Sequence, residues 1–275
     1  MKKFLALVLA ALMVFAFVAC NGTGKDNNGA SDASNASNTS DTSDTTEKAT
    51  LVMATNAAFP PYEFKEGDSF AGIDVEIAGK IAEKLGMTLE IKDVEFGSIV
   101  GGVQTGKFDI GMAGMTVTDE RLKSVNFSDS YATGIQVVIV KADSAIKSLD
   151  DLKGDGSMKF GVQQDTTGDI YASDTVENFG FGEDNVIRYK TGNEAVLALT
   201  SGKITAVIID NEPAKSYVAS NTGLKILDGA YTTEEYAICV AKENTELLDQ
   251  INKALEELIA DGTVRSIVDK YITAE

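Results

Sequence analysis

From Leu51 onward, short apolar runs of strand length alternate with segments of helical periodicity. The first helical segment has Ile77, Ile81 and Leu85 on one face and is closed by Gly86. In chain order, the predicted elements are a strand at Leu51–Thr55, a helix at Asp74–Leu85, a strand at Thr88–Val94, a helix from Ile99 to near Gly106, and a strand at Phe108–Met112. This βαβαβ order predicts a parallel sheet flanked by helices.

A second unit repeats the pattern. Its predicted elements are a strand at Gln136–Val140, a helical turn at Ser148–Leu152, a strand at Lys159–Val162, a helix from about Gly168 to Asn178, a helix capped by Asn193 that runs to Ser201, and a strand at Ala206–Asp210. Two final helices, Leu247–Ile259 and Val264–Tyr271, have no strands of their own, so we expect them to pack on the first unit. The predicted domains are lobe 1, residues 50–134 plus 233–275, and lobe 2, residues 135–232.

The N-terminus has the features of a secretory signal. Lys2 and Lys3 precede the apolar run Phe4–Ala19, which is shorter than the roughly 20 residues of a membrane-spanning helix. Phe17–Cys20 resembles a lipobox, in which cleavage before Cys20 leaves a lipid on that residue. We predict a signal peptide at 1–19 and an extracytoplasmic protein anchored to the cell membrane as a lipoprotein. The alternative is a cleaved signal with no lipid.

Residues 20–49 consist mainly of Ser, Thr, Asn, Asp, Gly and Ala. A segment with so few bulky apolar side chains cannot bury enough surface to offset its loss of conformational entropy. We therefore predict a disordered tether between Cys20 and the folded part.

Composition excludes several classes of function. The net charge of −18 argues against binding to nucleic acid or to an anionic membrane surface. The chain has no His, which removes the commonest general base and metal ligand. The two cysteines are Cys20 and Cys239, and the second lies in an apolar run that predicts a buried side chain. We predict a protein that is not an enzyme and that uses no metal and no cofactor.

The segment Asp109–Arg121 begins as an apolar strand, contains Gly111 and Gly114, and ends in hydroxyls and a guanidinium. Small residues allow a ligand to approach the backbone, and an Arg can grip a carboxylate at two points. The segment therefore indicates a site for an acid, although a turn followed by an ordinary surface Arg has the same pattern.

Ligands of open α/β sheets bind beyond the carboxyl ends of the strands. The residues that follow the predicted strands are Asn56, Phe59, Pro60, Pro61, Tyr62, Gly114, Thr116, Thr118, Arg121, Gln163, Gln164, Asp165, Thr166, Thr167 and Asp210. They supply aromatic faces, hydroxyls, one Arg and few carboxylates, which are the groups that an α-amino acid needs.

The groups of an α-amino acid can be matched to these residues. Its carboxylate suits Arg121 and backbone N–H groups near Thr116 and Thr167, and its ammonium suits Asp210, the Gly114 carbonyl and the Thr116 hydroxyl. Its side chain could lie between Phe59 and Phe96. Core packing is the alternative role for Phe59, Phe96 and Tyr62, and helix capping is the alternative for Asp210.

Five segments resemble polar amino-acid ABC-transporter substrate-binding proteins, the bacterial solute-binding protein family 3. They are Thr55–Phe64, Gly72–Ile77, Gly114–Arg121, Val125–Tyr131 and Gly161–Gly168. The resemblance extends from about Leu51 to Tyr271. It implies a two-lobed, periplasmic-binding-protein-like (type II) α/β fold, in which each lobe is a mostly parallel sheet flanked by helices.

The resemblance implies the same roles for Arg121, Asp210 and the aromatic residues, and it places Asn56 near the end of the ligand side chain. The predicted ligand-binding residues are Asn56, Phe59, Tyr62, Phe96, Gly114, Met115, Thr116, Arg121, Gln164, Thr166, Thr167 and Asp210. Asn56 stands where relatives that bind basic or amide side chains often carry Asp, which argues against a strongly cationic ligand. Asp165 stands where Gly is usual.

We therefore predict a monomer that binds a free polar L-amino acid outside the cytoplasm and delivers it to the permease and ATPase subunits of an ABC transporter. A glutamine-like side chain is the first choice and a basic one the second. One alternative is a cyclohexadienyl-dehydratase-like enzyme on the same scaffold, for which Glu63 and Asp210 are the candidate acids. The other alternative is a ligand-sensing domain of a membrane receptor.

Overall fold

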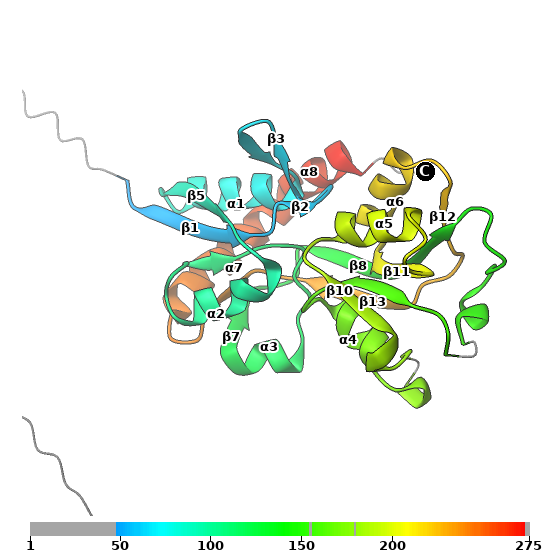
Figure 1. Ribbon diagram of the computed structural model, residues 1–275. Helices are drawn as coiled ribbons and strands as arrows, with labels where there is room; N and C mark the ends of the chain where they lie inside the picture. Colours follow the sequence, from blue (N-terminus) through cyan, green and yellow to red (C-terminus); the bar gives the residue numbers. More distant parts are fainter. Residues whose placement is uncertain (1–47, 154–155, 179, 273–275) are drawn as a thin grey trace, which may run out of the picture. The chain divides into compact units, whose positions relative to one another are not determined.

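Two sheets, each flanked by helices, organise the folded part of the chain (Figure 1). The computed structural model describes residues 48–153, 156–178 and 180–272. The predicted signal peptide, Cys20 and almost all of the predicted tether lie outside these residues. The described residues all belong to one compact unit. None of the helices within the described ranges has the length and apolarity to span a membrane.

The first sheet has the strand order β5-β1-β6-β14-β7. Its strands are β1 (Thr50–Thr55), β5 (Thr88–Asp93), β6 (Ile110–Gly111), β7 (Val125–Phe127) and β14 (Cys239–Ala241). β1 runs parallel to β5 and β6, whereas β14 is antiparallel to β6 and β7. Helix α1 (Ile73–Lys84) covers one face, and α2 (Ile99–Gln104), preceded by the 3₁₀ turn η1 (Phe96–Ser98), covers the other (Figure 1).

The second sheet has the order β10-β9-β11-β8-β12, and β13 also pairs with β8. Its strands are β8 (Ala132–Lys141), β9 (Phe160–Gln163), β10 (Val186–Tyr189), β11 (Ala206–Asp210), β12 (Leu224–Ile226) and β13 (Thr232–Tyr236). β9 is parallel to β10 and β11, but β8 is antiparallel to β11, β12 and β13. Figure 1 shows α5 (Gly192–Thr200) and α6 (Asn211–Ser220) on one side of this sheet and α4 (Thr167–Ser173) on the other.

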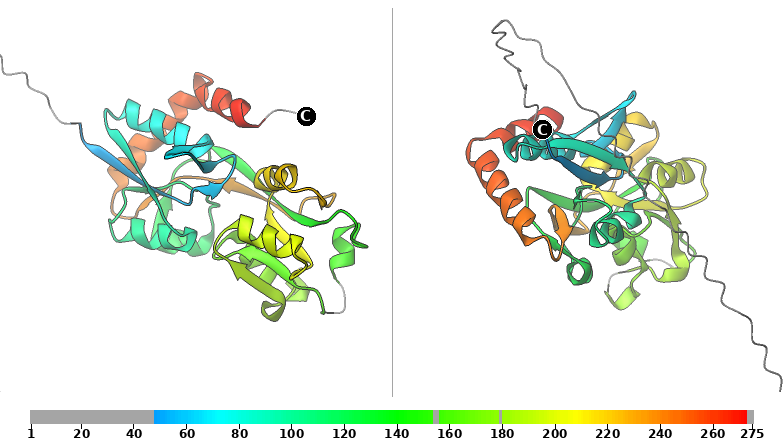
Figure 2. Two further views of the ribbon diagram at one scale, coloured as in Figure 1. Left: turned by 45° about the horizontal axis from the view of Figure 1, so that its top comes forward. Right: turned by 90° about the vertical axis from the view of Figure 1, so that its left-hand side faces the viewer.

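The last two helices, α7 (Thr245–Ala260) and α8 (Thr263–Tyr271), pack on α1 and on each other (Figure 2). The buried face of α7 includes Ile251, Leu255 and Leu258. Gly262, with a φ of 81°, makes the turn between the two helices, where a left-handed conformation favours glycine. These C-terminal helices therefore complete the first lobe, as the sequence predicts.

β8 and β13 carry the chain between the two sheets. β8 follows β7 of the first sheet, and β14 of the first sheet follows β13. The backbone of Val117 donates to the Glu235 carbonyl at 3.2 Å, so β13 also contacts the segment that follows β6. The lobe boundaries at residues 134 and 232 fall within these strands and remain predictions.

Several short elements complete the fold. They are β2 (Ala58–Phe59), β3 (Glu63–Glu66), β4 (Ser69–Ala71), α3 (Asp119–Ser124), η2 (Leu149–Leu152), η3 (Val176–Asn178) and η4 (Glu183–Asn185). Strands β2, β3 and β4 form a small antiparallel sheet. They shape the loop that brings Asn56, Phe59 and Glu63 toward the pocket described below.

The predicted two-lobed α/β fold is confirmed, with three local corrections. The residue that caps α5 is Thr191, not Asn193, because the Thr191 hydroxyl accepts from the Glu194 amide and the Glu194 carboxylate accepts from the Lys190 amide. The helix predicted to end at Asn178 stops at Ser173, since the next residue, Asp174, is extended. The sheets are mixed and not mostly parallel as predicted, because β8 and β14 pair antiparallel with their neighbours, a direction that apolar content alone does not reveal.

Candidate functional site

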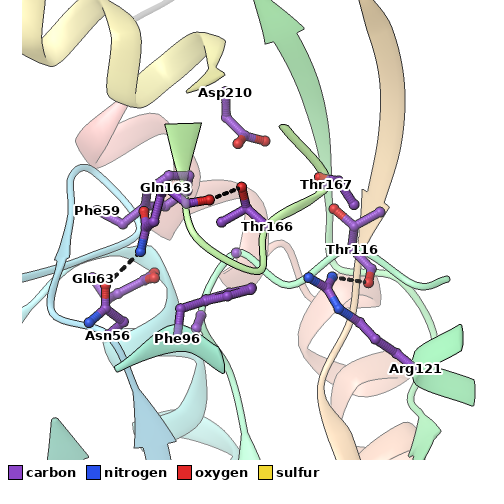
Figure 3. A pocket seen from close by; sticks show the side chains of 12 residues that line it. Asn56, Phe59, Glu63, Phe96, Thr116, Arg121, Gln163, Thr166, Thr167 and Asp210 are labelled. Carbon is purple, nitrogen blue, oxygen red and sulfur yellow. Dashed lines mark hydrogen bonds between the residues drawn. The ribbon is translucent and has the colours of Figure 1, made fainter. Parts of the chain in front are cut away.

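A pocket lies between the carboxyl ends of the strands of both sheets (Figure 3). The space between its side chains, which is partly continuous with solvent, is about 300 Å³. Its lining residues are Asn56, Phe59, Glu63, Phe96, Ala113, Gly114, Thr116, Arg121, Gln163, Thr166, Thr167 and Asp210. In Figure 3, Asp210 lies above the space, Arg121 to its right, and Asn56 and Glu63 to its left.

Arg121 comes from α3, a short helix whose N-terminus is capped by the Thr118 hydroxyl. Its Nη1 donates to the Thr116 carbonyl at 2.7 Å, and its Nη2 donates to the Asp165 carbonyl at 3.1 Å. The guanidinium carbon lies 5.1 Å from the centre of the Phe96 ring. These contacts fix the plane of the guanidinium. Burial lowers the pKa of Arg121, although nearby carboxylates oppose this effect and an Arg stays charged at neutral pH.

Asp210 is the last residue of β11 and is only 7% exposed. Burial raises the pKa of its carboxyl to about 7, while a hydrogen bond from the Tyr236 hydroxyl acts in the opposite direction. Its side chain therefore faces Tyr236 and the pocket instead of capping α6. A buried carboxyl of this kind is strongly stabilised in its ionised form when a cation binds beside it.

Gly114 lets the backbone approach the pocket closely. Its φ is 51°, and a Cβ at this position would lie 3.0 Å from the Phe59 ring. Its amide donates at 2.8 Å to the carboxylate of Asp74, which also accepts from the Tyr131 hydroxyl at 2.9 Å. Asp74 is therefore structural, as is Asp109, whose carboxylate accepts from the Val52 amide.

The left end of the pocket in Figure 3 is polar. The Gln163 amide donates to the Asn56 side-chain oxygen at 2.9 Å, and Asn56 donates to the Val94 carbonyl at 2.8 Å. Glu63 is 1% exposed, and its Oε2 has no hydrogen-bond partner among the described residues. Burial and the negative charge of Asp74 raise the pKa of Glu63 well above its usual range.

The two pocket threonines come from different sheets. Thr116 follows β6, and Thr167 is the first residue of α4, after β9. Both hydroxyls donate to the carboxylate of Glu234 on β13, each at 3.0 Å. Thr166 caps α4, because its hydroxyl accepts from the Asp169 amide.

Asp165 has the left-handed conformation that glycine adopts most easily, with a φ of 64°. Its carbonyl accepts from Arg121, and its side chain lies against Gly97 of η1. Asp165 of the second lobe therefore contacts the first lobe at the rim of the pocket.

The structure brings nine of the twelve predicted ligand-binding residues into the pocket lining: Asn56, Phe59, Phe96, Gly114, Thr116, Arg121, Thr166, Thr167 and Asp210. It does not place Tyr62, Met115 or Gln164 there. Tyr62 packs edge-on against Tyr236 at 5.1 Å, Met115 is fully buried in the core, and Gln164 is exposed.

The predicted set omits Glu63, Ala113 and Gln163, which do line the pocket. Gln163 is among the strand-end residues of the sequence analysis, and the alternation of side chains along a strand could have selected it in place of Gln164, because it is the last residue of β9 and the next residue faces the other way. Glu234 is also absent from the predicted set, although it contacts two lining residues. Its position 67 residues after Thr167 gives no local signal.

A family model of bacterial extracellular solute-binding proteins, family 3, matches residues 51–274. The chain belongs to this family. The predicted family is therefore confirmed, and the matched segment contains every residue of the pocket.

Among curated relatives, the arginine-binding extracellular protein ArtP of Bacillus subtilis (strain 168) is 33% identical over 277 residues, which cover 100% of both chains. A solved structure of an ancestral arginine-binding protein bound to arginine is 41% identical, with a TM-score of 0.74, and covers 82% of this chain and 99% of its own. A second structure of an ancestral arginine-binding protein, bound to glutamine, is 40% identical, with a TM-score of 0.75 and the same coverage.

The fold also resembles an ancestral amino-acid-binding protein described as a precursor of cyclohexadienyl dehydratase. That structure is 33% identical, with a TM-score of 0.73, and covers 81% of this chain and 95% of its own.

Proposed function

We propose that this chain binds a free amino acid with a cationic side chain, such as L-arginine, and delivers it to an ABC-type permease. The prediction of amino-acid binding for an ABC transporter is confirmed by the relatives, whose names include binding proteins for arginine, histidine, cystine and glutamine. The choice of a cationic side chain reverses the order expected from the sequence analysis, which placed a glutamine-like side chain first.

The observation that carries this choice is Glu63. Among the described residues that line the pocket, Arg121 is the one cation, against the carboxyl groups of Glu63 and Asp210. An α-amino acid supplies a carboxylate for Arg121 and an ammonium for Asp210, and these two pairs balance. Glu63 is the lining carboxyl that remains. One of its oxygens has no hydrogen-bond partner among the described residues, and a cation on the ligand side chain would favour its ionised form. Glu63 thus provides a carboxyl group at the end of the pocket where Asn56 replaces the Asp that relatives binding basic side chains often carry.

Glutamine is the second candidate. The side chains of Asn56 and Gln163 offer an amide oxygen and an amide N–H at the same end of the pocket, and a protonated Glu63 could donate to an amide oxygen. Ancestral arginine-binding proteins have been solved with each of these amino acids.

A thermal-shift panel of the twenty amino acids tests the proposal, after unfolding and refolding the protein to remove any carried-over ligand. A ligand at 100 times its dissociation constant should add about 2.7 kcal/mol to the free energy of unfolding. We expect the largest shift with L-arginine or L-lysine. A largest shift with glutamine would support the second candidate, and no shift with any amino acid would overturn the proposed function.

Binding without chemistry is part of the proposal. A dehydratase needs an acid of raised pKa, and Glu63 has one, so the alternative has a physical basis. The relatives with assigned ligands are nevertheless binding proteins. NMR spectra of bound and released ligand should show it unchanged after prolonged incubation, and turnover of a cyclic acid would contradict this.

Membrane anchoring through a lipid on Cys20 also remains a proposal, as does a monomeric state. Cys20→Ala should move the protein from the membrane fraction to the soluble fraction. Light scattering of the purified protein should give the mass of one chain.

A further inference from the structure

Glu234 lies behind the pocket, on the strand β13 that connects the lobes, and is 5% exposed. Its Oε2 accepts from the hydroxyls of Thr116 and Thr167 at 3.0 Å each, and from the side-chain amide of Gln136 at 3.1 Å. Figure 3 shows both threonines beside Arg121 in the pocket wall. One carboxylate oxygen thus holds hydroxyl groups that come from the two different lobes.

A hydroxyl has a single proton, and an ionised carboxylate can only accept hydrogen bonds. Because both threonines donate to Glu234, their oxygen atoms have only lone pairs left for the pocket. At Thr167 this direction is supported a second time, since the Gln136 amide also donates to its hydroxyl oxygen, at 3.4 Å. A lone pair attracts the N–H groups of an ammonium and repels a carboxylate.

We infer that Glu234 is a positioning residue that fixes the Thr116 and Thr167 hydroxyls as acceptors and thereby makes the site select ligands with an α-ammonium group. The ammonium then lies between these two oxygens and Asp210. The ligand carboxylate is left to Arg121 and to backbone N–H groups. This inference rests on the proposed function, because it concerns the amino-acid end of the same pocket.

The sequence interpretation let the Thr116 hydroxyl contribute to the ammonium site, but it gave no reason why that hydroxyl should accept and not donate. Glu234 supplies the reason. Without it, each hydroxyl could rotate to donate its proton to a carboxylate, and the site would lose its means of distinguishing an amino acid from a simple acid.

The test compares L-arginine with 5-guanidinopentanoate, the same molecule without the α-ammonium group, by calorimetric titration of the full protein. If wild-type protein binds L-glutamine instead, the matched pair is L-glutamine and glutaramate. We expect wild type to prefer the amino acid by about 100-fold or more, because the analogue leaves buried acceptors unpaired.

Glu234→Leu removes the acceptor and should reduce this preference by about tenfold or more. Glu234→Gln keeps an amide oxygen whose two lone pairs can accept from both threonine hydroxyls, so its preference should stay within about threefold of wild type. If Glu234→Leu does not fold, Glu234→Asp keeps the charge but withdraws it by one methylene, and should also reduce the preference.

The outcomes separate the two proposals. If neither amino acid binds to wild type, the proposed function fails. If wild type binds, but Glu234→Leu or Glu234→Asp weakens the binding of both members of a pair equally or leaves the preference unchanged, Glu234 is not a positioning residue for the ammonium.

Discussion

The two ends of the pocket are built differently. At the end that faces the constant part of an amino acid, each polar group already has partners in the protein: Arg121 is held by two carbonyls, Asp210 by Tyr236, and the two threonines by Glu234. At the other end, Asn56 and Gln163 bond to each other, and Glu63 has an oxygen that finds no hydrogen-bond partner in the described part of the chain. We call the first the constant end and the second the variable end. The constant end is preorganised, whereas the variable end can change its contacts with the ligand.

The two ends should contribute differently to affinity and to selectivity. Preorganised charged groups lose little entropy on binding, so changes at the first end should lower the affinity for every ligand. Changes at the second end should alter the preference among ligands, because there the protein groups must match a particular side chain.

The largest expected effect comes from Arg121→Ala, which removes the partner of the ligand carboxylate. Leaving a buried carboxylate without its cation should weaken binding by about 3–5 kcal/mol, measured by calorimetric titration with L-arginine. Arg265→Ala is the matched control, since Arg265 pairs with Asp269 on the exposed side of α8. Retained affinity in Arg121→Ala would show that the carboxylate binds elsewhere.

Asp210→Asn should weaken the binding of every amino acid by about 2–3 kcal/mol, because the ammonium loses its buried counter-charge. The unliganded variant should be at least as stable as wild type, since burial disfavours the ionised carboxyl. Asp249→Asn on the exposed face of α7 is the control. A selective loss of affinity for one amino acid would contradict a role at the constant end.

The pH dependences of stability and of binding should have opposite signs. Burial raises the pKa values of Asp74 and Asp210 to about 7, so the native state holds protons that the unfolded chain releases near pH 4. The free energy of unfolding without ligand should therefore fall as the pH rises from about 4 through about 7.

Binding of the ammonium ionises Asp210 and releases a proton. The affinity for L-glutamine, whose neutral side chain does not require an ionised Glu63, should therefore increase by up to about tenfold per pH unit below pH 7 and level off above it, measured by titrations from about pH 5 to about pH 8. Asp210→Asn should flatten this dependence. A wild-type affinity that does not vary with pH would exclude proton release from Asp210.

Glu63→Gln tests whether the variable end selects a cationic ligand side chain. Removing the charge should weaken L-arginine binding by about 1–2 kcal/mol and leave L-glutamine binding unchanged or stronger. Glu66→Gln, an exposed residue on the same strand β3, is the control. If both ligands lose affinity equally, Glu63 has a structural role and the cationic side chain loses its main support.

The smallest effect is expected at the rim. A Cβ on Gly97 would lie 2.0 Å from the Asp165 carboxylate of the other lobe, which must then move. Gly97→Ala should weaken ligand binding by about 1 kcal/mol through poorer contact between the lobes, and Asp165→Gly should restore it. Gly101→Ala, where an added Cβ meets no atom within 4 Å, is the control. An unaltered affinity in Gly97→Ala would show that this contact is dispensable.

Much of the fold could be predicted because its signals are local. Apolar periodicity located β1, α1, β9, β11 and α7, since a helix or strand must bury one face and the period shows in neighbouring residues. The direction of β8 could not be predicted in this way. Parallel and antiparallel strands both read as apolar runs when they are buried, and the pairing depends on residues far along the chain.

The same distinction applies to the site. Arg121, Thr116 and Asp210 follow strands directly, so a general rule about strand ends located them. Tyr62 and Met115 also follow strands, but their side chains turn into the core, because packing and not sequence position decides the direction of a loop side chain. Glu63 begins the short strand β3, which packs against α1, and only that packing directs it toward the pocket.

The amino-acid sequence was sufficient to predict the class of protein, the two α/β lobes and the groups proposed to hold an amino acid by its constant part. These predictions depend on composition, hydrophobic periodicity and local motifs, all of which involve residues close together in the sequence. The tertiary structure alone decided that Glu63 faces the variable end and that Glu234 joins the threonines of the two lobes. Both contacts unite residues distant in the chain, and only the folded backbone brings them within hydrogen-bonding distance.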